Sequence, residues 1–455
     1  MKPQIAFLSA AFFLNLLGGV TALAQDKSAV ITASSTATTA PLPITPFEYI
    51  PTQRWKEPDP AKVIKRTGEA LKVEGLYRDG KYSEAGGAGL ALLETVRADD
   101  ELRLYIANSL AWTNRLKEAL ILYEGLMAGE FKQDAMLGLA NINRWQGKEH
   151  LAIPLYKSIL KNEPDNKDAK DGLRLALRDV RPRATLRIGG STDSSNVTLH
   201  SILLNHRWRD ESNTSVWELE TVNTQLQNTV IRASGTELTV RYKMLETPYK
   251  PRFELGFDNN NVYANAGIEL DALPIKFELG KINWGRLSSN PKALAAGLSA
   301  NRLGAQLNLP TLYGHLFASA EINKVSDGNT VTSSTIRYTP SWQPLGSAFK
   351  LFTGIESRSA RFNTTSYWSP NLGYASGFVG MRGEWSGPEW DVAASGQVGS
   401  RISGEAGQNW SATLSAKRWL SDDWALGINL WALSSFRDGL AYKVRSAYVN
   451  VEKIW

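Results

Sequence analysis

The sequence predicts an α + β protein of two domains, in which α-helical repeats precede an antiparallel transmembrane β-barrel of about sixteen strands. Three observations predict this fold class. Between residues 61 and 180 a short motif recurs at a period typical of helical repeats. From residue 181 to residue 455, apolar residues alternate with small or charged ones over long segments. The chain also contains 15 tryptophans, many of them at the ends of those segments.

The first 24 residues have the composition of a secretory signal peptide. Lys2 supplies the positive end, residues 5–20 form a short apolar core, and residues 22–24 fit a small-x-small cleavage site. The alternative is an uncleaved anchor helix, which the short and Gly-interrupted core disfavours. Residues 25–60 are rich in Ser, Thr, Ala and Pro without periodicity, which predicts a flexible linker. We therefore expect an exported protein.

The helical region, residues 61–180, contains three copies of one motif. Residues 80–85 align with residues 114–119 and with residues 147–152, and Tyr123 and Tyr156 keep the same offset. This pattern resembles the tetratricopeptide repeat, in which pairs of amphipathic helices stack on one another. The resemblance implies a domain of helix pairs whose first helices line a concave face.

Alternation replaces helical periodicity from residue 181 onward. Residues 253–257 and residues 424–430 each present one apolar face and one face of small, polar or charged residues. Strands that lie between lipid and a wet lumen have this pattern. Aromatic residues near strand ends are expected at the level of the lipid headgroups, and here they include Trp208, Trp217, Trp342, Trp385, Trp410 and Trp419.

About sixteen such segments can be counted, and an even number returns the C-terminus to the side from which the barrel starts. Tight turns at residues 272–274, 386–388 and 420–423 are expected on the periplasmic side, and the longest connections, at residues 364–372 and 402–408, on the opposite side. The predicted strands begin near Arg183, Val197, Ser215, Val230, Arg252, Val262, Ile275, Ala293, Leu312, Thr330, Ala348, Gly373, Glu389, Trp410, Trp424 and Tyr442.

The chain ends in Trp455, with Val451 and Val449 in the same alternation frame. This ending resembles the terminal β-signal of outer-membrane proteins, from which Lys453 departs. The resemblance implies insertion into the outer membrane and contact with its lipids.

Composition and motifs argue against an enzyme and against a nucleic-acid partner. The net charge of +6 arises from 51 basic and 45 acidic residues spread along the chain, whereas a nucleic-acid binder shows a concentrated basic patch. The four histidines have no metal-binding spacing, and hydrolase and phosphate-loop motifs are absent. We expect no catalytic residue, no metal and no cofactor.

The domain order and one short motif indicate a function. Helical repeats ahead of a sixteen-strand barrel resemble the exporters of bacterial exopolysaccharides, in particular those of poly-N-acetylglucosamine and cellulose. Residues 367–370, Tyr-Trp-Ser-Pro, resemble the Tyr-aromatic-Ser/Asn-Pro element that those barrels carry in a late loop. The chain departs from them in having three repeats rather than a long solenoid.

This resemblance implies an outer-membrane conduit for a polysaccharide. Its periplasmic repeats, residues 61–180, would dock polymer or components of a periplasmic or inner-membrane synthase. The alternative is a non-transporting barrel that acts through its repeats as an assembly scaffold or surface receptor.

Asn108 and Trp112 recur as Asn141 and Trp145 in the next repeat. Tetratricopeptide geometry would place them on the concave face, where rings could stack on sugars and polar groups could bind hydroxyls. The alternative is that Trp112 and Trp145 fill the seam between repeats. The candidate residues of this substrate-binding groove are Tyr77, Asn108, Trp112, Asn141, Arg144 and Trp145.

Inward side chains set the selectivity of a pore. The lumen candidates are Glu254, Asp258, Glu278, Glu356, Arg358, Arg382 and Asp391, each of which is also a candidate for an ion pair within the lumen. In the Tyr367–Pro370 motif, two adjacent aromatic rings are costly to leave in water, and proline restricts the backbone. We therefore expect Tyr367, Trp368 and Pro370 to fold inward and constrict the lumen. The alternative is an outward loop packed on its neighbours.

Overall fold

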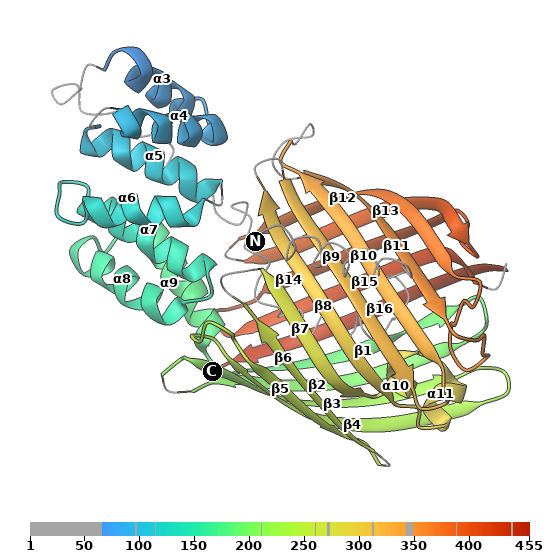
Figure 1. The fold of residues 1–455 in the computed structure, drawn as a ribbon. Helices are drawn as coiled ribbons and strands as arrows, with labels where there is room; N and C mark the ends of the chain where they lie inside the picture. The colour runs from blue at the N-terminus through green and yellow to red at the C-terminus, as the bar shows by residue number, and fades with distance from the viewer. Residues whose placement is uncertain are drawn as a thin grey trace, which may run out of the picture. The chain divides into compact units, whose positions relative to one another are not determined.

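The computed structural model describes residues 66–455, apart from residues 96–97, 114, 211, 260, 271–273, 312–313, 343–348, 388 and 438–439. The expected signal peptide (1–24) and linker (25–60) lie outside the described residues. The chain forms two compact units, one helical and one a β-barrel (Figure 1). No helix in the described ranges is both long and apolar enough to cross a bilayer.

The helical unit consists of antiparallel pairs. Helix α3 pairs with α4, α5 with α6 and α7 with α8, while α9 packs against α8. Their bounds are α3 Gly68–Arg78, α4 Tyr82–Thr95, α5 Asp100–Trp112, α6 Leu116–Leu126, α7 Lys132–Trp145, α8 Glu149–Asn162 and α9 Lys167–Val180.

Glycines let the helices cross closely at matching positions of successive repeats. A Cβ atom at Gly138 of α7 would lie 2.3 Å from the Tyr123 ring of α6, and one at Gly172 of α9 would lie 2.5 Å from the Tyr156 ring of α8. Each tyrosine ring therefore occupies the space that a glycine leaves on the next helix. This contact explains why Tyr123 and Tyr156 recur at the repeat period.

Sixteen antiparallel strands close into a barrel, as the sequence predicts, and β1 pairs with β16 to complete it. The strands are β1 Arg183–Asp193, β2 Thr198–Arg209, β3 Ser215–Gln227, β4 Arg232–Met244, β5 Arg252–Phe257, β6 Val262–Glu269, β7 Ile275–Ile282, β8 Ala300–Thr311, β9 Gly314–Val325, β10 Thr330–Pro340, β11 Phe349–Ala360, β12 Tyr374–Ser386, β13 Trp390–Gly404, β14 Asn409–Trp419, β15 Trp424–Arg437 and β16 Leu440–Ile454.

The predicted start of the eighth strand is wrong. Strand β8 begins at Ala300 rather than near Ala293, because two short helices precede it, α10 (Trp284–Leu287) and α11 (Pro291–Ala295). The connection between β7 and β8, residues 283–299, is therefore long. Conversely, the connection predicted at residues 402–408 is shorter than expected, because β13 continues to Gly404.

The outward face of the barrel is apolar, which suits strands that face lipid. Ile188, Leu204, Phe253, Leu279 and Val449 are exposed there on five different strands. This alternation is the pattern that the sequence predicts for a transmembrane sheet.

Aromatic rings gather on the outward face at the barrel end that contains Arg183 and Trp455, which we name the terminal end. His206 stacks between Trp208 and Trp455, with ring centroids 5.0 and 5.1 Å away. The ammonium of Lys453 lies 5.1 Å from the ring centroid of Trp424 and 3.3 Å from a carboxylate oxygen of Asp423. These contacts accommodate Lys453, the one residue that departs from the apolar alternation near the C-terminus.

Trp419 does not belong to this outward belt. Trp410 is exposed on the outward face of β14, and Trp419 lies an odd number of residues further along the same strand, so it points inward. Its indole N–H donates to Asp391 at 3.2 Å, and the ring is buried. The expectation that all six strand-end tryptophans lie at headgroup level is therefore wrong for Trp419.

Candidate functional site

Ion pairs cover much of the inward face of β3 to β7. The guanidinium of Arg241 donates to Glu254 at 2.8 Å and to Glu220 at 3.0 Å. Glu278 accepts from Arg252 and lies 2.8 Å from Lys276. The predicted lumen residues Glu254 and Glu278 therefore point inward, and both are ion-pair members.

The other predicted lumen carboxylates also have partners. Asp391 lies 3.5 Å from the ammonium of Lys417. Asp258 follows β5 and accepts hydrogen bonds from the backbone N–H of Asn261 at 2.7 Å and from the Asn283 amide at 3.1 Å. Buried Glu356 accepts from the Tyr374 hydroxyl at 3.2 Å.

The two predicted lumen arginines differ in their surroundings. Arg382 donates to Glu384. Arg358, on the inward face of β11, has its guanidinium carbon 5.1 Å from the ring centroid of Trp368 and 5.8 Å from that of Trp284. Trp284 belongs to the β7–β8 connection, so this connection reaches β11 inside the barrel.

The connection between β7 and β8 also reaches the opposite wall. The Arg286 guanidinium donates to both carboxylate oxygens of Glu237 on β4, at 3.0 and 3.2 Å, and the Asn283 amide donates to Glu237 at 2.8 Å. Arg286 and Glu237 are both buried. Further along, Leu294 of α11 packs against buried Leu199, Leu226 and Tyr448 of three other strands.

Helix caps shape this segment locally. The side chain of Asn283 accepts from the backbone N–H of Arg286 at 3.0 Å, and that of Asn290 accepts from the backbone N–H of Lys292 at 2.9 Å. Pro291 follows Asn290 in the first turn of α11, a position where proline lacks no needed N–H. The Asn-Pro pair was a signal in the sequence for a helix start in this region.

The loop between β11 and β12, residues 361–373, contacts Trp284 and the inward residue Arg358, and its effect on the width of the lumen stays a prediction. The Tyr367 hydroxyl donates to both carboxylate oxygens of Asp327, at 2.8 and 3.0 Å, and its ring lies edge-on to Trp284 with centroids 5.5 Å apart. Trp368 packs edge-on against Tyr374, 5.2 Å away. Tyr367 and Trp368 are only 3% and 8% exposed, so their rings build the loop's core rather than a free surface for stacking.

The two connections touch each other. The Lys292 ammonium donates to the Thr365 hydroxyl at 2.9 Å, and Tyr367 joins Trp284 and Leu287 in one apolar cluster. We name residues 283–299 and 361–373 together the constriction. It lies at the barrel end opposite the C-terminus, where Figure 1 shows α10 and α11, and we name this end the loop end.

The candidate groove residues of the helical unit lie in packing contacts. Asn108 donates to the Tyr77 hydroxyl at 3.1 Å and accepts from the Tyr123 hydroxyl at 2.6 Å, while the Tyr156 hydroxyl donates to Asn141 at 2.7 Å. Burial raises the pKa of Tyr77 to about 12, although the hydrogen bond with Asn108 lowers it. These asparagines thus link neighbouring helices.

The two tryptophans among the candidate groove residues, Trp112 and Trp145, also lie in packing contacts. Trp145 is buried in the core of the helical unit, and Trp112 packs against this core, stacked 5.8 Å from Tyr77. Arg144 is also buried. The contacts are those of residues that fill the seam between repeats, the alternative to an open groove.

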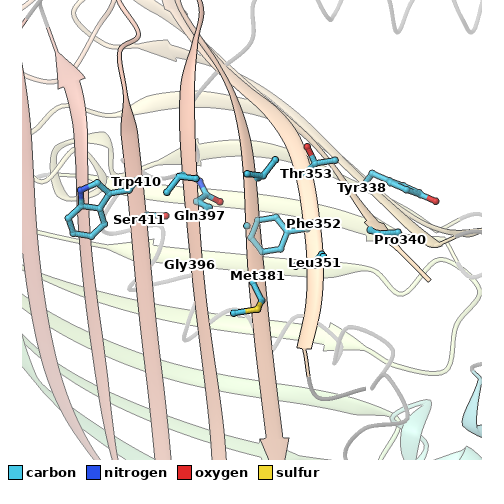
Figure 2. A pocket seen from close by; sticks show the side chains of 13 residues that line it. Tyr338, Pro340, Leu351, Phe352, Thr353, Met381, Gly396, Gln397, Trp410 and Ser411 are labelled. Carbon is cyan, nitrogen blue, oxygen red and sulfur yellow. The ribbon is translucent and has the colours of Figure 1, made fainter. Parts of the chain in front are cut away.

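An apolar hollow of about 930 Å³ lies over strands β10 to β14. Tyr338, Leu351, Met381 and Trp410 line it (Figure 2), and Val398 is a further lining residue. Strand alternation places these side chains on the outward face, where Met381, Val398 and Trp410 are exposed. The hollow therefore opens away from the lumen and is separate from the constriction.

No group of three or more His, Asp and Glu side chains in the described part of the chain could hold a metal ion. No protein-family model matches the sequence, and no curated protein matches it.

Several solved structures match about 60% of this chain at low sequence identity. A bacterial polysaccharide outer membrane secretin matches with a TM-score of 0.47 and 12% identity, over 60% of this chain and 98% of that chain. CdiB from Acinetobacter baumannii matches with a TM-score of 0.39 and 10% identity, over 60% of each chain. OccK11 of Pseudomonas aeruginosa matches with a TM-score of 0.34 and 9% identity, over 60% of this chain and 96% of that chain.

Proposed function

We propose that this protein is an outer-membrane conduit for the export of a polysaccharide, with the helical unit in the periplasm. The observation that carries the proposal is a sixteen-strand barrel with an apolar outward face and a charged inward face, into which two contacting connections, residues 283–299 and 361–373, fold at one end. Barrels of this size enclose an aqueous lumen rather than a packed core.

The lumen wall suits a hydroxyl-rich chain better than an apolar solute. The charged groups of Glu254, Glu278 and Asp391 are neutralised by neighbouring cations, so each offers hydrogen bonds without a strong net field. Weak, repeated polar sites let a polymer enter and also leave. A sugar chain passing in single file needs only a narrow opening, which the constriction would set.

The helical unit is proposed to dock components of the export system or the polymer itself. Asn108, Asn141 and Trp145 are engaged in packing, so they leave docking to other surfaces of the unit.

The test is the current through single full-length molecules in planar lipid bilayers. Wild-type protein should conduct ions, and cellohexaose or chitohexaose added on the terminal side should block the current. Polyethylene glycol of the same hydrodynamic size should block it less, because it lacks hydroxyls along its chain.

A second variant separates a closed channel from a barrel that does not transport. If wild-type protein is silent, a variant lacking residues 366–372 should conduct and be blocked by the same sugars. Silence of both proteins, each in a correctly folded barrel, would reject the conduit and favour a scaffold or receptor.

A further inference from the structure

The charge balance of the lumen changes from one wall to the other. On β4 to β8, the guanidinium groups of Arg241, Arg252 and Arg302 each face a carboxylate. On β10 to β12 the inward cations Arg337, Lys350 and Arg382 share the wall with a single inward carboxylate in the terminal half, Glu384, which pairs with Arg382.

Arg337 is held by aromatic rings instead of a carboxylate. It lies on β10 opposite Phe317 of β9 and Gly354 of β11. Its guanidinium carbon is 5.1 Å from the ring centroid of Phe317 and 5.6 Å from that of Phe352. Within the described ranges of the chain, no carboxylate lies at ion-pair distance from Arg337, and no group of the protein accepts a hydrogen bond from it.

Glycines give the rings their places on this wall. A Cβ atom at Gly380 would lie 2.4 Å from the Phe352 ring, and one at Gly354 would lie 2.5 Å from the Phe378 ring. Phe352 and Phe378 pack edge to face, with centroids 6.1 Å apart. The rings are therefore closely packed, and Phe352 of β11, which is labelled in Figure 2, helps to hold Arg337 in position.

Nearby, the sheet register sets two cations against each other. Lys350 of β11 is the direct cross-strand partner of Arg382 of β12, and like charges at such positions destabilise a sheet. Arg382 is already paired with Glu384 and Lys350 also has a contact within the protein, so Arg337 is the cation of this wall on which a bound anion would act most directly.

We infer that this wall binds the carboxylate of an acidic sugar unit, with Arg337 as its main contact. A planar guanidinium donates two parallel N–H bonds to a carboxylate, and among the described residues none accepts a hydrogen bond from Arg337. The inference rests on the proposed function and deepens it by naming the substrate class: a glycan that carries uronate or another carboxylate substituent.

The site lies where a polymer that enters the barrel at the terminal end would make its first contact. Arg337 lies three residues before the end of β10 at Pro340, and Lys350 is the second residue of β11, so both lie near the terminal end. A polymer entering there would meet this site before it reached the constriction at the loop end.

Calorimetric titration of full-length protein in detergent tests the site without requiring conductance. Hexagalacturonate is the acidic probe, and cellohexaose is the neutral control of equal length. Wild-type protein should bind hexagalacturonate at low salt and bind cellohexaose at least tenfold more weakly, since charge-assisted hydrogen bonds are the stronger kind.

Two variants that each remove one positive charge from the lumen show whether position matters. Arg337→Gln should weaken binding of hexagalacturonate about tenfold or more, because it removes the fork that meets the carboxylate. Arg252→Gln, which removes a cation already paired with Glu278, should weaken it less than about twofold. Heat-modifiable migration in a detergent gel shows that each variant is a folded barrel.

Equal weakening by both variants, or equal binding of the acidic and the neutral hexamer, would overturn the inference. These outcomes differ from a failure of the proposed function. A channel that conducts and is blocked by neutral sugars, but does not bind hexagalacturonate, would retain the conduit and reject the site. Binding that depends on Arg337 in a protein that never conducts would retain the site and reject the conduit.

Discussion

The buried pair of Arg286 and Glu237 anchors the constriction to β4, and Arg286→Ala should release it. The substitution removes the two hydrogen bonds at 3.0 and 3.2 Å. It leaves a buried carboxylate that keeps its hydrogen bonds from Asn283 and Thr239. Removing one partner of a buried ion pair costs about 3–5 kcal/mol. Because Glu237 keeps those two hydrogen bonds, we expect a cost near the lower end, about 3 kcal/mol.

That cost is large enough to change the population of the anchored state. Since about 1.4 kcal/mol corresponds to a factor of ten, the ratio of anchored to released segment should fall by about 100-fold. Leu294 stays in its apolar contact with Leu199 and Leu226, which contributes about 2 kcal/mol to holding α11. The segment should therefore open often without leaving the barrel.

Single-channel recording measures this directly. Arg286→Ala should give a larger mean conductance and frequent current fluctuations compared with wild-type protein. The matched control is the double variant Glu237→Gln with Arg286→Met, which leaves no buried charge and should disturb the current less. If folded Arg286→Ala channels had the conductance and noise of wild-type channels, the pair could not be an anchor of the constriction.

Three further predictions concern the helical unit and are read from thermal unfolding followed by circular dichroism at 222 nm. Trp145→Ala should destabilise the unit by about 3–5 kcal/mol, since it leaves a cavity at a buried site. A change below about 1 kcal/mol would indicate that this side chain lies in an open groove instead. Gly138→Ala should cost about 1–3 kcal/mol by overpacking a tyrosine ring, whereas Gly87→Ala, with nothing within 4 Å of the added atom, should be neutral or stabilising. Burial raises the pKa of Asp99, but hydrogen bonds from Arg66 and a backbone N–H outweigh it and hold that pKa below the usual 3.8. A lowered pKa in the folded state stabilises above about pH 4, and this contribution disappears as the pH falls, so Asp99→Asn should make melting less sensitive to acid.

Alternation was sufficient to predict the barrel because one face of each strand meets lipid and the other meets water. The predicted start of β8 failed because the run Ala293–Ala296, followed by Leu298 and Ala300, is apolar enough for a strand. The segment folds as helix because Asn283 and Asn290 cap it and because Leu294 finds an apolar site inside the barrel. The caps could have been read from the sequence, whereas that apolar site is formed by three distant strands.

The sequence predicts which side chains of the candidate site point into the barrel, but it does not predict which groups they pair with. Alternation identifies Glu254 and Glu278 as inward, but the cations they meet depend on the register between strands, which alternation does not set. The same limit hid the Arg286–Glu237 pair, because its partners lie on elements far apart in the chain. In the helical unit, the recurrence of Asn108 reflected hydrogen bonds between helices, and periodicity alone does not distinguish such contacts from a ligand groove.

The central claim is that inward-folded loops set the width of a glycan conduit, and the largest solute that the channel admits tests it most directly. The cut-off can be measured by the exclusion of graded polyethylene glycols in planar bilayers, for wild-type protein and for a variant lacking residues 366–372. The account predicts that the deletion raises the conductance and admits larger polymers while the barrel stays folded. An unchanged cut-off and conductance in a correctly folded deletion variant would contradict it.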